Sequence, residues 1–344
     1  MKYTMLLWPH ANARYQQETR RLAKAELQLM LERLARDAGV EIDEAASMPS
    51  LSIDTPEPLS PEALEAISNH SLLYGLLERR ADGALMPVIG RAAAWLGEDL
   101  PAILKYKGKT NEMFLQLLIN VALYSGDFWD EAGAIDFLDP MCGRATAPFI
   151  ALNRGWNAVG ADVDKNDLHE AGKFFKRYLE YHRFKHTLTR ESRTVRGKKP
   201  VPVTRFNVGS TPERFKAGET LSLQLMNLDA AQAGDAFGKP CFHIVACDLP
   251  YGVKHDAQSG GDRLRGKNAM ETLLTRSLTS LHGLLRTGGT LAMSFNAQTL
   301  HRNRLRDWMA DAGFLVLSGG PYDAFEHWVE QAITRDIVVG RKIR

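Results

Sequence analysis

The segment at residues 248–252, DLPYG, carries side chains that could bind and activate a planar amine. It follows an apolar run, which predicts a buried parallel strand. Pro250 has no N–H and holds Leu249 extended, so the strand must end here. The Asp248 carboxylate and the Leu249 carbonyl could then each accept one N–H of an amino group, while Tyr251 stacks on its ring. An ordinary turn after a strand is the competing interpretation of the same residues.

A second segment of this kind lies upstream at residues 134–146, AIDFLDPMCGRAT. It predicts another buried strand, a tight turn made of small residues, and the start of a helix. Ligands of open α/β sheets bind at the carboxyl ends of the strands, so both segments should meet at one edge. A nicotinamide-binding turn would need the three glycines of GxGxxG. Only Gly143 is present here.

Together the two segments resemble the motifs of class I S-adenosylmethionine-dependent methyltransferases that act on exocyclic amino groups of nucleic-acid bases. Within that superfamily they are most similar to the tRNA guanine 2-amino methyltransferases, which usually carry a THUMP domain. The motifs of that family look like D-P-x-C-G-S-G-T and D-[PL]-P-[YF]-G. The resemblance runs from about residue 106 to the C-terminus and includes Asn120-Val121-Ala122 and the pattern His327…Thr334-Arg335.

The resemblance implies an α/β fold, a Rossmann-like doubly wound class I methyltransferase sheet with a small N-terminal α+β domain. It also implies S-adenosyl-L-methionine as the methyl donor and RNA, with tRNA preferred, as the partner. A sulfonium donor needs no metal. The residues that the resemblance assigns to the cofactor are Asp139, Pro140, Cys142, Gly143, Asp162, Asp229 and Ala230, and those it assigns to catalysis are Asp248, Leu249, Pro250 and Tyr251.

Three of the cofactor residues have distinct expected roles. Asp139 and the turn after it would hold the amino-acid end of the cofactor. Asp162 would accept hydrogen bonds from the ribose hydroxyls, as an acid does in dinucleotide folds. Asp229 would accept the adenine amino group. Asp164 and Asn207 remain as alternatives to Asp162 and Asp229, respectively.

The acceptor side of the reaction is difficult because an exocyclic amine delocalises its lone pair into the ring. Hydrogen bonds to Asp248 and the Leu249 carbonyl would favour a pyramidal nitrogen with its lone pair aimed at the methyl group. Positioning two reactants can lower a barrier by roughly 7–11 kcal/mol, and the carboxylate would stabilise the developing positive charge. Leu249 in place of the commoner proline is similar to some guanine-modifying relatives, which favours guanine over adenine.

The composition is that of a globular protein, and its cysteines fit a reducing environment. The chain has 344 residues, of which 44% are hydrophobic and 24% charged, and a net charge of +2. No apolar run approaches the roughly 20 residues that a membrane helix requires, and the N-terminus does not have the pattern of a signal sequence. The three cysteines have neither disulfide nor metal spacing, which predicts a cytoplasmic location.

The charge is distributed unevenly along the chain. Residues 1–100 carry 10 Lys/Arg against 15 Asp/Glu, whereas residues 101–344 carry 33 against 26. The basic excess is concentrated at 173–199, and residues 187–207 predict a basic, hairpin-like insertion. We assign this insertion to RNA docking through phosphate contacts, although a solvated helix face would look the same. The residues concerned are Arg193, Arg196, Lys198 and Lys199.

Residues 1–95 predict a separate α+β domain that could help to dock RNA. The pattern indicates a strand at 3–8, a helix at 16–37 stopped by Gly39, and a strand near 50–53. Ser60 followed by Pro61 is typical of a helix start. No stretch resembles a THUMP domain, and about 95 residues are fewer than the usual arrangement has. The methyltransferase domain would then span 96–344.

The remaining pattern completes the expected domain. Strands are predicted at 158–162, 221–227, 290–295, 314–317 and 334–339, and helices at 113–124, 147–153, 166–186, 270–285 and 302–312. Thr110 or Asn111 would cap the first of these helices. The Gly-rich segment 253–268 predicts a mobile loop over the acceptor site. His327 and Arg335 are interpreted as structural or RNA-facing residues, and the scattered histidines show no metal spacing.

Three other functions fit parts of the same pattern. An adenine 6-amino methyltransferase acting on DNA or rRNA would use the same catalytic residues, but would be expected to carry a separate target-recognition region. A non-catalytic RNA-binding module would keep the basic insertion. A small-molecule amine methyltransferase would not need that insertion.

Overall fold

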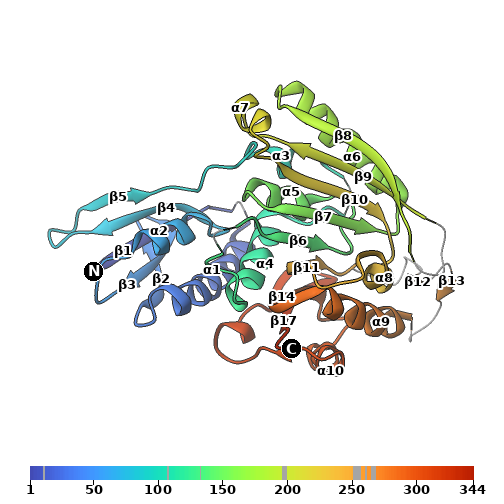
Figure 1. Cartoon of the computed structure of the whole chain (residues 1–344). Helices are drawn as coiled ribbons and strands as arrows, with labels where there is room; N and C mark the ends of the chain where they lie inside the picture. Colours follow the sequence, from blue (N-terminus) through green and yellow to red (C-terminus); the bar gives the residue numbers. More distant parts are fainter. Residues whose placement is uncertain are drawn as a thin grey trace.

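The computed structural model describes residues 1–10, 12–106, 108–131, 133–195, 200–250, 257–259, 262–264 and 269–344. Within them the chain forms two sheets, each with its own helices, and a short two-stranded sheet of β12 (Ala257–Ser259) and β13 (Asp262–Leu264). Figure 1 shows the N-terminal domain protruding from the side of the larger C-terminal one.

The large sheet has a mostly parallel centre. Strands β10, β7, β6, β11 and β14 are neighbours in that order, and each pairs in parallel with the next. Strand β17 is antiparallel to both β14 and β15. The bounds are β6 Asp136–Asp139, β7 Asn157–Asp162, β10 Leu221–Asn227, β11 Phe242–Asp248, β14 Leu285–Asn296, β15 Leu315–Val316, β16 His327–Glu330 and β17 Ile333–Arg341.

Helices cover both faces of this sheet because neighbouring strand residues point to opposite sides. Phe137 joins the core that contains α4, α5 and α6, whereas the adjacent Leu138 joins the core that contains α9 and α10. The doubly wound, Rossmann-like sheet predicted from the sequence is confirmed. The helices are α3 Leu100–Ile103, α4 Glu112–Ser125, α5 Thr146–Asn153, α6 Lys165–Tyr181, α7 Pro212–Lys216, α8 Ala233–Phe237, α9 Ala269–Leu284 and α10 Arg302–Asp311, with single 3-10 turns at Ala230–Gln232 and Gly320–Asp323.

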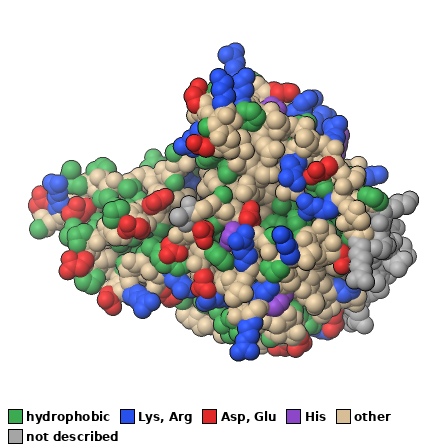
Figure 2. All heavy atoms as spheres, viewed as in Figure 1, with side chains coloured by type: hydrophobic (Ala, Val, Ile, Leu, Met, Phe, Trp, Pro, Cys, Tyr) green, Lys and Arg blue, Asp and Glu red, His purple; other side chains and the backbone are tan. Residues whose placement is uncertain are grey.

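The insertion after α6 is a β-hairpin, as its turn-like tip predicts. Strands β8 (His186–Arg193) and β9 (Val201–Val208) are antiparallel, and β9 extends the large sheet beyond β10. Helix α6 ends at Tyr181, so the expectation that it continues to residue 186 is wrong. Figure 2 shows Lys and Arg side chains standing out at the edge of the molecule where Figure 1 places α7.

The N-terminal domain is an antiparallel sheet in the order β2-β3-β1-β4-β5, with two helices. Its first six elements follow the β-α-β-β-α-β order of ferredoxin-like folds, and β5 adds an edge strand. The elements are β1 Lys2–Leu7, α1 Ala13–Leu34, β2 Gly39–Ala45, β3 Met48–Asp54, α2 Pro61–Ser68, β4 Leu73–Arg79 and β5 Leu85–Ile89.

The first long helix differs from its predicted bounds. Asn12 caps it, because its side chain accepts a hydrogen bond from Tyr15 N at 3.2 Å, and the helix ends at Leu34. Gly39 therefore begins β2 and does not stop the helix. The predicted start of α2 is confirmed, since Ser60 Oγ accepts from Ala63 N at 3.2 Å and Pro61 follows it.

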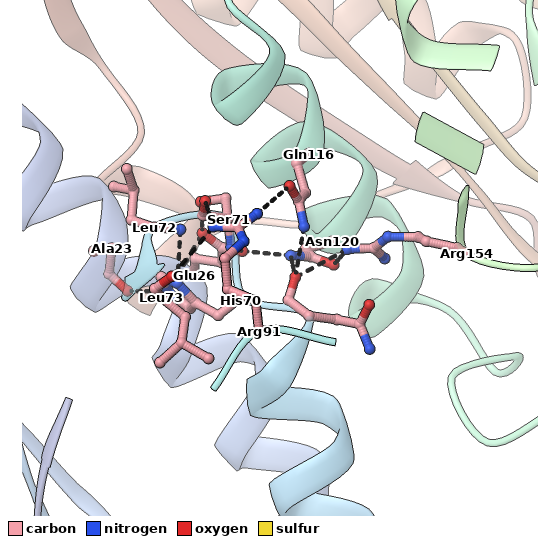
Figure 3. Close-up of polar contacts among 11 residues, drawn as sticks. Ala23, Glu26, His70, Ser71, Leu72, Leu73, Arg91, Gln116, Asn120 and Arg154 are labelled. Atoms are coloured by element: carbon pink, nitrogen blue, oxygen red, sulfur yellow. Dashed lines mark hydrogen bonds and ion pairs between the residues drawn. The ribbon is translucent and has the colours of Figure 1, made fainter. Parts of the chain in front are cut away.

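A buried polar network joins α1, α4 and α5 where the two domains meet (Figure 3). The Glu26 carboxylate accepts hydrogen bonds from Ser71 N at 2.9 Å, from the Ser71 hydroxyl and from the Asn120 amide. Asn120 in turn accepts from the guanidinium of Arg154. Apolar side chains of α1 and α4 pack beside this network in one core, so the domains form a continuous body.

Candidate active site

Three carboxylates lie at the carboxyl ends of adjacent parallel strands. Asp139 ends β6, Asp162 ends β7 and Asp248 ends β11. Strand β6 pairs with both of the others, so the two segments singled out by sequence meet at one sheet edge. Asp139 is buried and Asp162 half-buried.

Asp248 is held by side chains from three distant parts of the chain. Thr110 Oγ1 donates to Asp248 Oδ2 at 2.6 Å, and Ser294 Oγ donates to Asp248 Oδ1 at 2.7 Å. The Arg335 guanidinium lies 3.5 Å from Oδ2, and both side chains of this ion pair are at least nine-tenths buried. Hydrogen bonds donated to both oxygens fix the orientation of this carboxylate.

Two of these partners were not assigned to the site by sequence reasoning. Ser294 lies on β14, and the parallel register places it directly opposite Asp248. Thr110 is available because Asn111 provides the cap of α4, with its Oδ1 accepting from Met113 N at 2.8 Å and from Phe114 N at 3.2 Å. A cap-forming pair at residues 110 and 111 was the only signal for Thr110.

Arg335 lies at the candidate catalytic carboxylate, a position that the interpretation as a structural or RNA-facing residue did not anticipate. Its guanidinium stacks over the Phe114 ring at 4.2 Å, and this contact fixes it beside Asp248. The ring of His327 also contacts Phe114, with 5.4 Å between the ring centroids. Burial lowers the pKa of His327 to about 4, so this ring is neutral at physiological pH.

The residues after Asp248 are only partly described. Leu249 is buried, and its N–H donates to the Ser294 carbonyl at 2.9 Å, which extends the pairing with β14 by one residue. Pro250 is exposed. Tyr251, the predicted stacking residue, and most of the predicted mobile loop at 253–268 lie outside the described residues.

The turn after β6 makes a small, tightly hydrogen-bonded loop. Met141 N donates to Asp139 Oδ1 at 3.0 Å, and Gly143 N donates to Asp162 Oδ2 at 2.7 Å. Gly143 has φ of +49°, and a Cβ placed there would meet no atom of the described residues within 4 Å. The described part of the chain therefore leaves space beside this glycine. Pro140, between Asp139 and Met141, is buried.

The underside of the turn is packed closely against β7. Cys142 N donates to the Ala161 carbonyl at 3.0 Å. A Cβ at Gly160 would come within 2.8 Å of Cys142 Sγ, so only glycine allows this approach. Burial raises the pKa of the Cys142 thiol well above its usual value, so this residue acts as a packing group.

Arg144 and Ala145 occupy the positions where the resembled family has Ser and Gly, and neither obstructs the turn. Arg144 is directed away, with Nε donating to Asp167 at 2.8 Å and its guanidinium 4.8 Å from the Tyr106 ring. Ala145 takes the left-handed conformation that the family's glycine would adopt easily, with φ of +65°.

Two of the three acids at the sheet edge, Asp139 and Asp162, have raised pKa values. Burial, together with the nearby charges of Asp162 and Asp248, raises the pKa of Asp139 well above the usual range of a carboxyl. Burial also raises the pKa of Asp162, against the effect of the hydrogen bonds from Asp164 N and Gly143 N. In the described part of the chain, neither Asp139 nor Asp162 forms an ion pair. This edge therefore favours a cationic ligand.

Asp229 and Ala230 follow β10, the next strand beyond β7, and both are buried. Asp229 Oδ1 accepts from Ala231 N at 2.9 Å and caps the 3-10 turn. The alternatives have other contacts. Asp164 caps α6 through Asn166 N at 2.8 Å, and Asn207 bonds Thr187 across the β8–β9 hairpin.

Of the four predicted RNA-docking residues, the structure describes only Arg193. It is half-buried, with its guanidinium 4.6 Å from the Phe237 ring and donating to Gln224 at 3.3 Å. Arg196, Lys198 and Lys199 lie outside the described residues.

The described residues contain no group of three or more His, Cys, Asp or Glu side chains that could hold a metal ion. The same residues contain no helix with the length and hydropathy needed to cross a bilayer.

Comparisons with known proteins give only distant structural likenesses. No protein-family model and no curated protein sequence matches the chain. TrmN from Thermus thermophilus is 13% identical over 100% of both chains, with a TM-score of 0.45. The 16S rRNA N2 methyltransferase RsmC from T. thermophilus, solved with AdoMet and guanosine, is 12% identical over 90% of this chain and 59% of that one, with a TM-score of 0.37.

The likenesses also include methyltransferases of other substrates. Magnesium protoporphyrin IX methyltransferase from Synechocystis, solved with bound SAM, is 15% identical over 71% of this chain and 90% of that one, with a TM-score of 0.37. Likenesses at this level do not bear on activity, so the fold assignment rests on strand order. The sheet β10-β7-β6-β11-β14-β17-β15, with β17 as its reversed strand, has the order of the class I methyltransferase fold.

Proposed function

We propose that the protein transfers a methyl group from S-adenosylmethionine to an exocyclic amino group of a base in RNA, with the 2-amino group of guanosine in tRNA as the preferred acceptor. The observation that carries the proposal is the crowding of Asp139, Asp162 and Asp248 at one sheet edge, beside a turn whose Gly143 leaves space among the described residues. S-adenosylmethionine has a sulfonium and an ammonium group, so its positive charges complement this edge.

The chain's residues fit the cofactor part by part. Asp139 would hold the ammonium group, since its buried carboxylate has one hydrogen bond, from Met141 N, among the described residues. Asp162 would accept from the ribose hydroxyls with the lone pairs that Gly143 N and Asp164 N leave open. Asp229 follows the next strand and would accept the adenine amino group. When bound, the cofactor supplies an electrophilic methyl group.

Asp248 would orient the acceptor amine. The hydroxyls of Thr110 and Ser294 hold its carboxylate in one position, and the guanidinium of Arg335 lies 3.5 Å from it. One N–H of the amine would bond this carboxylate and the other the Leu249 carbonyl, which localises the nitrogen lone pair. Preorganised charge of this kind acts where positive charge develops, and costs no reorganisation during the reaction.

RNA as the substrate is supported by the basic excess of the catalytic domain. Residues 101–344 carry 33 Lys/Arg against 26 Asp/Glu, and the β8–β9 hairpin with residues 196–199 at its tip is where we place phosphate contacts. Guanine is preferred to adenine on the basis of Leu249, and tRNA on the resemblance of the two motifs. Stacking of the base on Tyr251 completes the proposed acceptor site.

The test compares Asp248→Asn with Asp139→Asn. We expect Asp248→Asn to lower methyl transfer to bulk tRNA by about 10²–10³-fold or more, and to bind S-adenosylmethionine normally by calorimetry. Asp139→Asn should instead weaken cofactor binding. Digestion of the labelled RNA to nucleosides then identifies the methylated base, and 6-methyladenosine would move the acceptor assignment to adenine. Near-normal turnover by Asp248→Asn would refute the mechanism.

A further inference from the structure

Two exposed aromatic rings lie at the end of β1 in the N-terminal domain. Trp8 and Tyr74 are 42% and 50% exposed, and their ring centroids are 5.2 Å apart. The backbone N–H of Trp8 donates to the Leu72 carbonyl at 2.8 Å, which fixes the main chain that carries the ring. Large aromatic rings that stay exposed and fixed in position are suited to stacking against a flat ligand.

A second aromatic pair continues from the first toward the catalytic domain. His10 and Tyr15 have ring centroids 4.6 Å apart, and His10 Nδ1 accepts from Asn12 N at 3.0 Å. Trp8, His10 and Tyr15 together line one side of a cavity of about 30 Å³. That volume is too small for a base, so a ligand would stack on the rings at its rim.

The segment that supports Asp248 lines the same cavity. Asn111 and Phe114 are among its lining residues, and Thr110, the residue before Asn111, donates to the Asp248 carboxylate. Arg335 stacks on Phe114 and pairs with Asp248. Its positive charge also opposes the effect of burial, which raises the pKa of Tyr15. The aromatic rim and the candidate acceptor site are therefore immediate neighbours.

The charge of this domain shows which part of a nucleic acid would make the contact. Residues 1–100 carry 15 Asp/Glu against 10 Lys/Arg, which disfavours phosphates. Stacking on aromatic rings uses the face of a base and is available only where bases are unpaired. The two pairs would thus bind bases, while the basic catalytic domain binds phosphates.

We propose that Trp8–Tyr74 and His10–Tyr15 form a stacking track for the unpaired nucleotides beside the target base. The substrate is then a single-stranded stretch of RNA, such as a loop or an end, that crosses the N-terminal domain on its way to Asp248. This deepens the proposed function and rests on it for the identity of the substrate as RNA.

The experiment measures binding of a fluorescent single-stranded RNA of about 12 nucleotides, and of the same strand annealed to its complement, by anisotropy. Trp8→Ala and Tyr74→Ala should weaken single-strand binding by roughly 5- to 150-fold, and Trp8→Phe should retain it. The slope of log Kd against log salt should stay unchanged, since no phosphate contact is lost. Tyr181→Ala, which removes an 83% exposed ring on α6, is the matched control.

Affinity of Trp8→Ala and Tyr74→Ala equal to that of Tyr181→Ala would overturn the track, as would a changed salt slope or equal loss with the duplex. Absence of any binding by the unmodified protein would also overturn it. The readout needs neither cofactor nor turnover. Weaker RNA binding by Trp8→Ala in a protein that fails to bind S-adenosylmethionine would therefore support the track and refute only the proposed methyl transfer.

Discussion

Two buried acidic sites in this molecule differ in how the protein compensates the burial of a carboxylate. At the domain junction, Glu26 is 1% exposed and accepts from Ser71 and Asn120, with His70 Nε2 at 3.4 Å from its carboxylate (Figure 3). Arg154 donates to Asn120 and so belongs to the same network. Burial lowers the pKa of Arg154 to about 10, which still leaves it charged at neutral pH. This acid is surrounded by protein donors.

At the sheet edge, Asp139 has fewer donors around it than Glu26 has. Asp139 is 4% exposed, yet Met141 N is its one hydrogen-bond donor in the described part of the chain. Its pKa is raised by burial and by two further carboxylates. Burying charge without compensation is costly, so we interpret Asp139 as a ligand-binding residue, as proposed above, and the junction as a structural network.

The largest expected effect is on stability, at the junction. Glu26→Ala leaves Arg154 and Asn120 buried without their acid, and should lower the free energy of unfolding by about 3–5 kcal/mol in urea titration. Glu32→Ala, on the exposed side of the same helix, is the matched control and should stay within about 0.5 kcal/mol. Methyl transfer per folded molecule should be unchanged. Loss of activity without loss of stability would erase the distinction between the two sites.

A smaller effect is expected at Thr110, on activity. Thr110→Val keeps the shape of the side chain and removes the hydroxyl that holds Asp248. That hydroxyl donates a hydrogen bond of 2.6 Å to the carboxylate. Hydrogen bonds to charged groups contribute about 1.5–3 kcal/mol, so the rate should fall roughly 10- to 100-fold. We expect kcat to fall while KM for S-adenosylmethionine stays constant.

Thr110→Ser is the control for this substitution, because it restores the hydroxyl and should restore the rate. An equal loss in both variants would assign Thr110 to packing against its neighbours. An unchanged rate in Thr110→Val would show that Ser294 and Arg335 suffice to hold the carboxylate.

The smallest expected effect is a proton released on cofactor binding. The raised pKa of Asp139 means that the free protein binds a proton between the ordinary carboxyl pKa and that raised value. A cationic ligand favours the ionised form, so affinity should rise with pH through this window and level off above it. Calorimetry in buffers of different ionisation enthalpy should show up to one proton released.

The raised pKa of Asp139 also makes the stability of the unliganded protein depend on pH. An acid with a raised folded pKa stabilises the unliganded protein at low pH, and this contribution is lost as pH rises through the window. Asp139→Asn should remove both the proton release and this slope. Proton release that persists in Asp139→Asn would assign it to another group.

The sequence predicted the central sheet well because its strands are continuous apolar runs ended by turn signals. It located Asp139, Asp162 and Asp248 for the same reason, since each ends such a run. It could not locate Ser294 or Arg335, because their places depend on the register of β14 against β11 and on the reversed direction of β17. The local sequence pattern contains information on neither the strand register nor the strand direction.

Strands β2 and β5 of the N-terminal domain were missed for a different reason, whereas β1 and β3 were predicted near their observed places. In β5, Leu85, Met86 and Val88 are all exposed, because the strand is at the edge of the sheet and alternation has no buried side to follow. In β2, Val40 is buried and Ile42 exposed, which breaks the period of two. Only the partner strands define these elements.

The order in which the chain is made has a consequence for the candidate site. Asp248 meets Thr110, 138 residues earlier, and Arg335, 87 residues later. A growing chain folds from its N-terminal side, so the acid emerges from the ribosome well before its cation. The contacts around Asp248 are complete only when β17 has inserted between β14 and β15. Until that late step, a nascent chain has the framework of the fold without the full set of contacts at the candidate acceptor site.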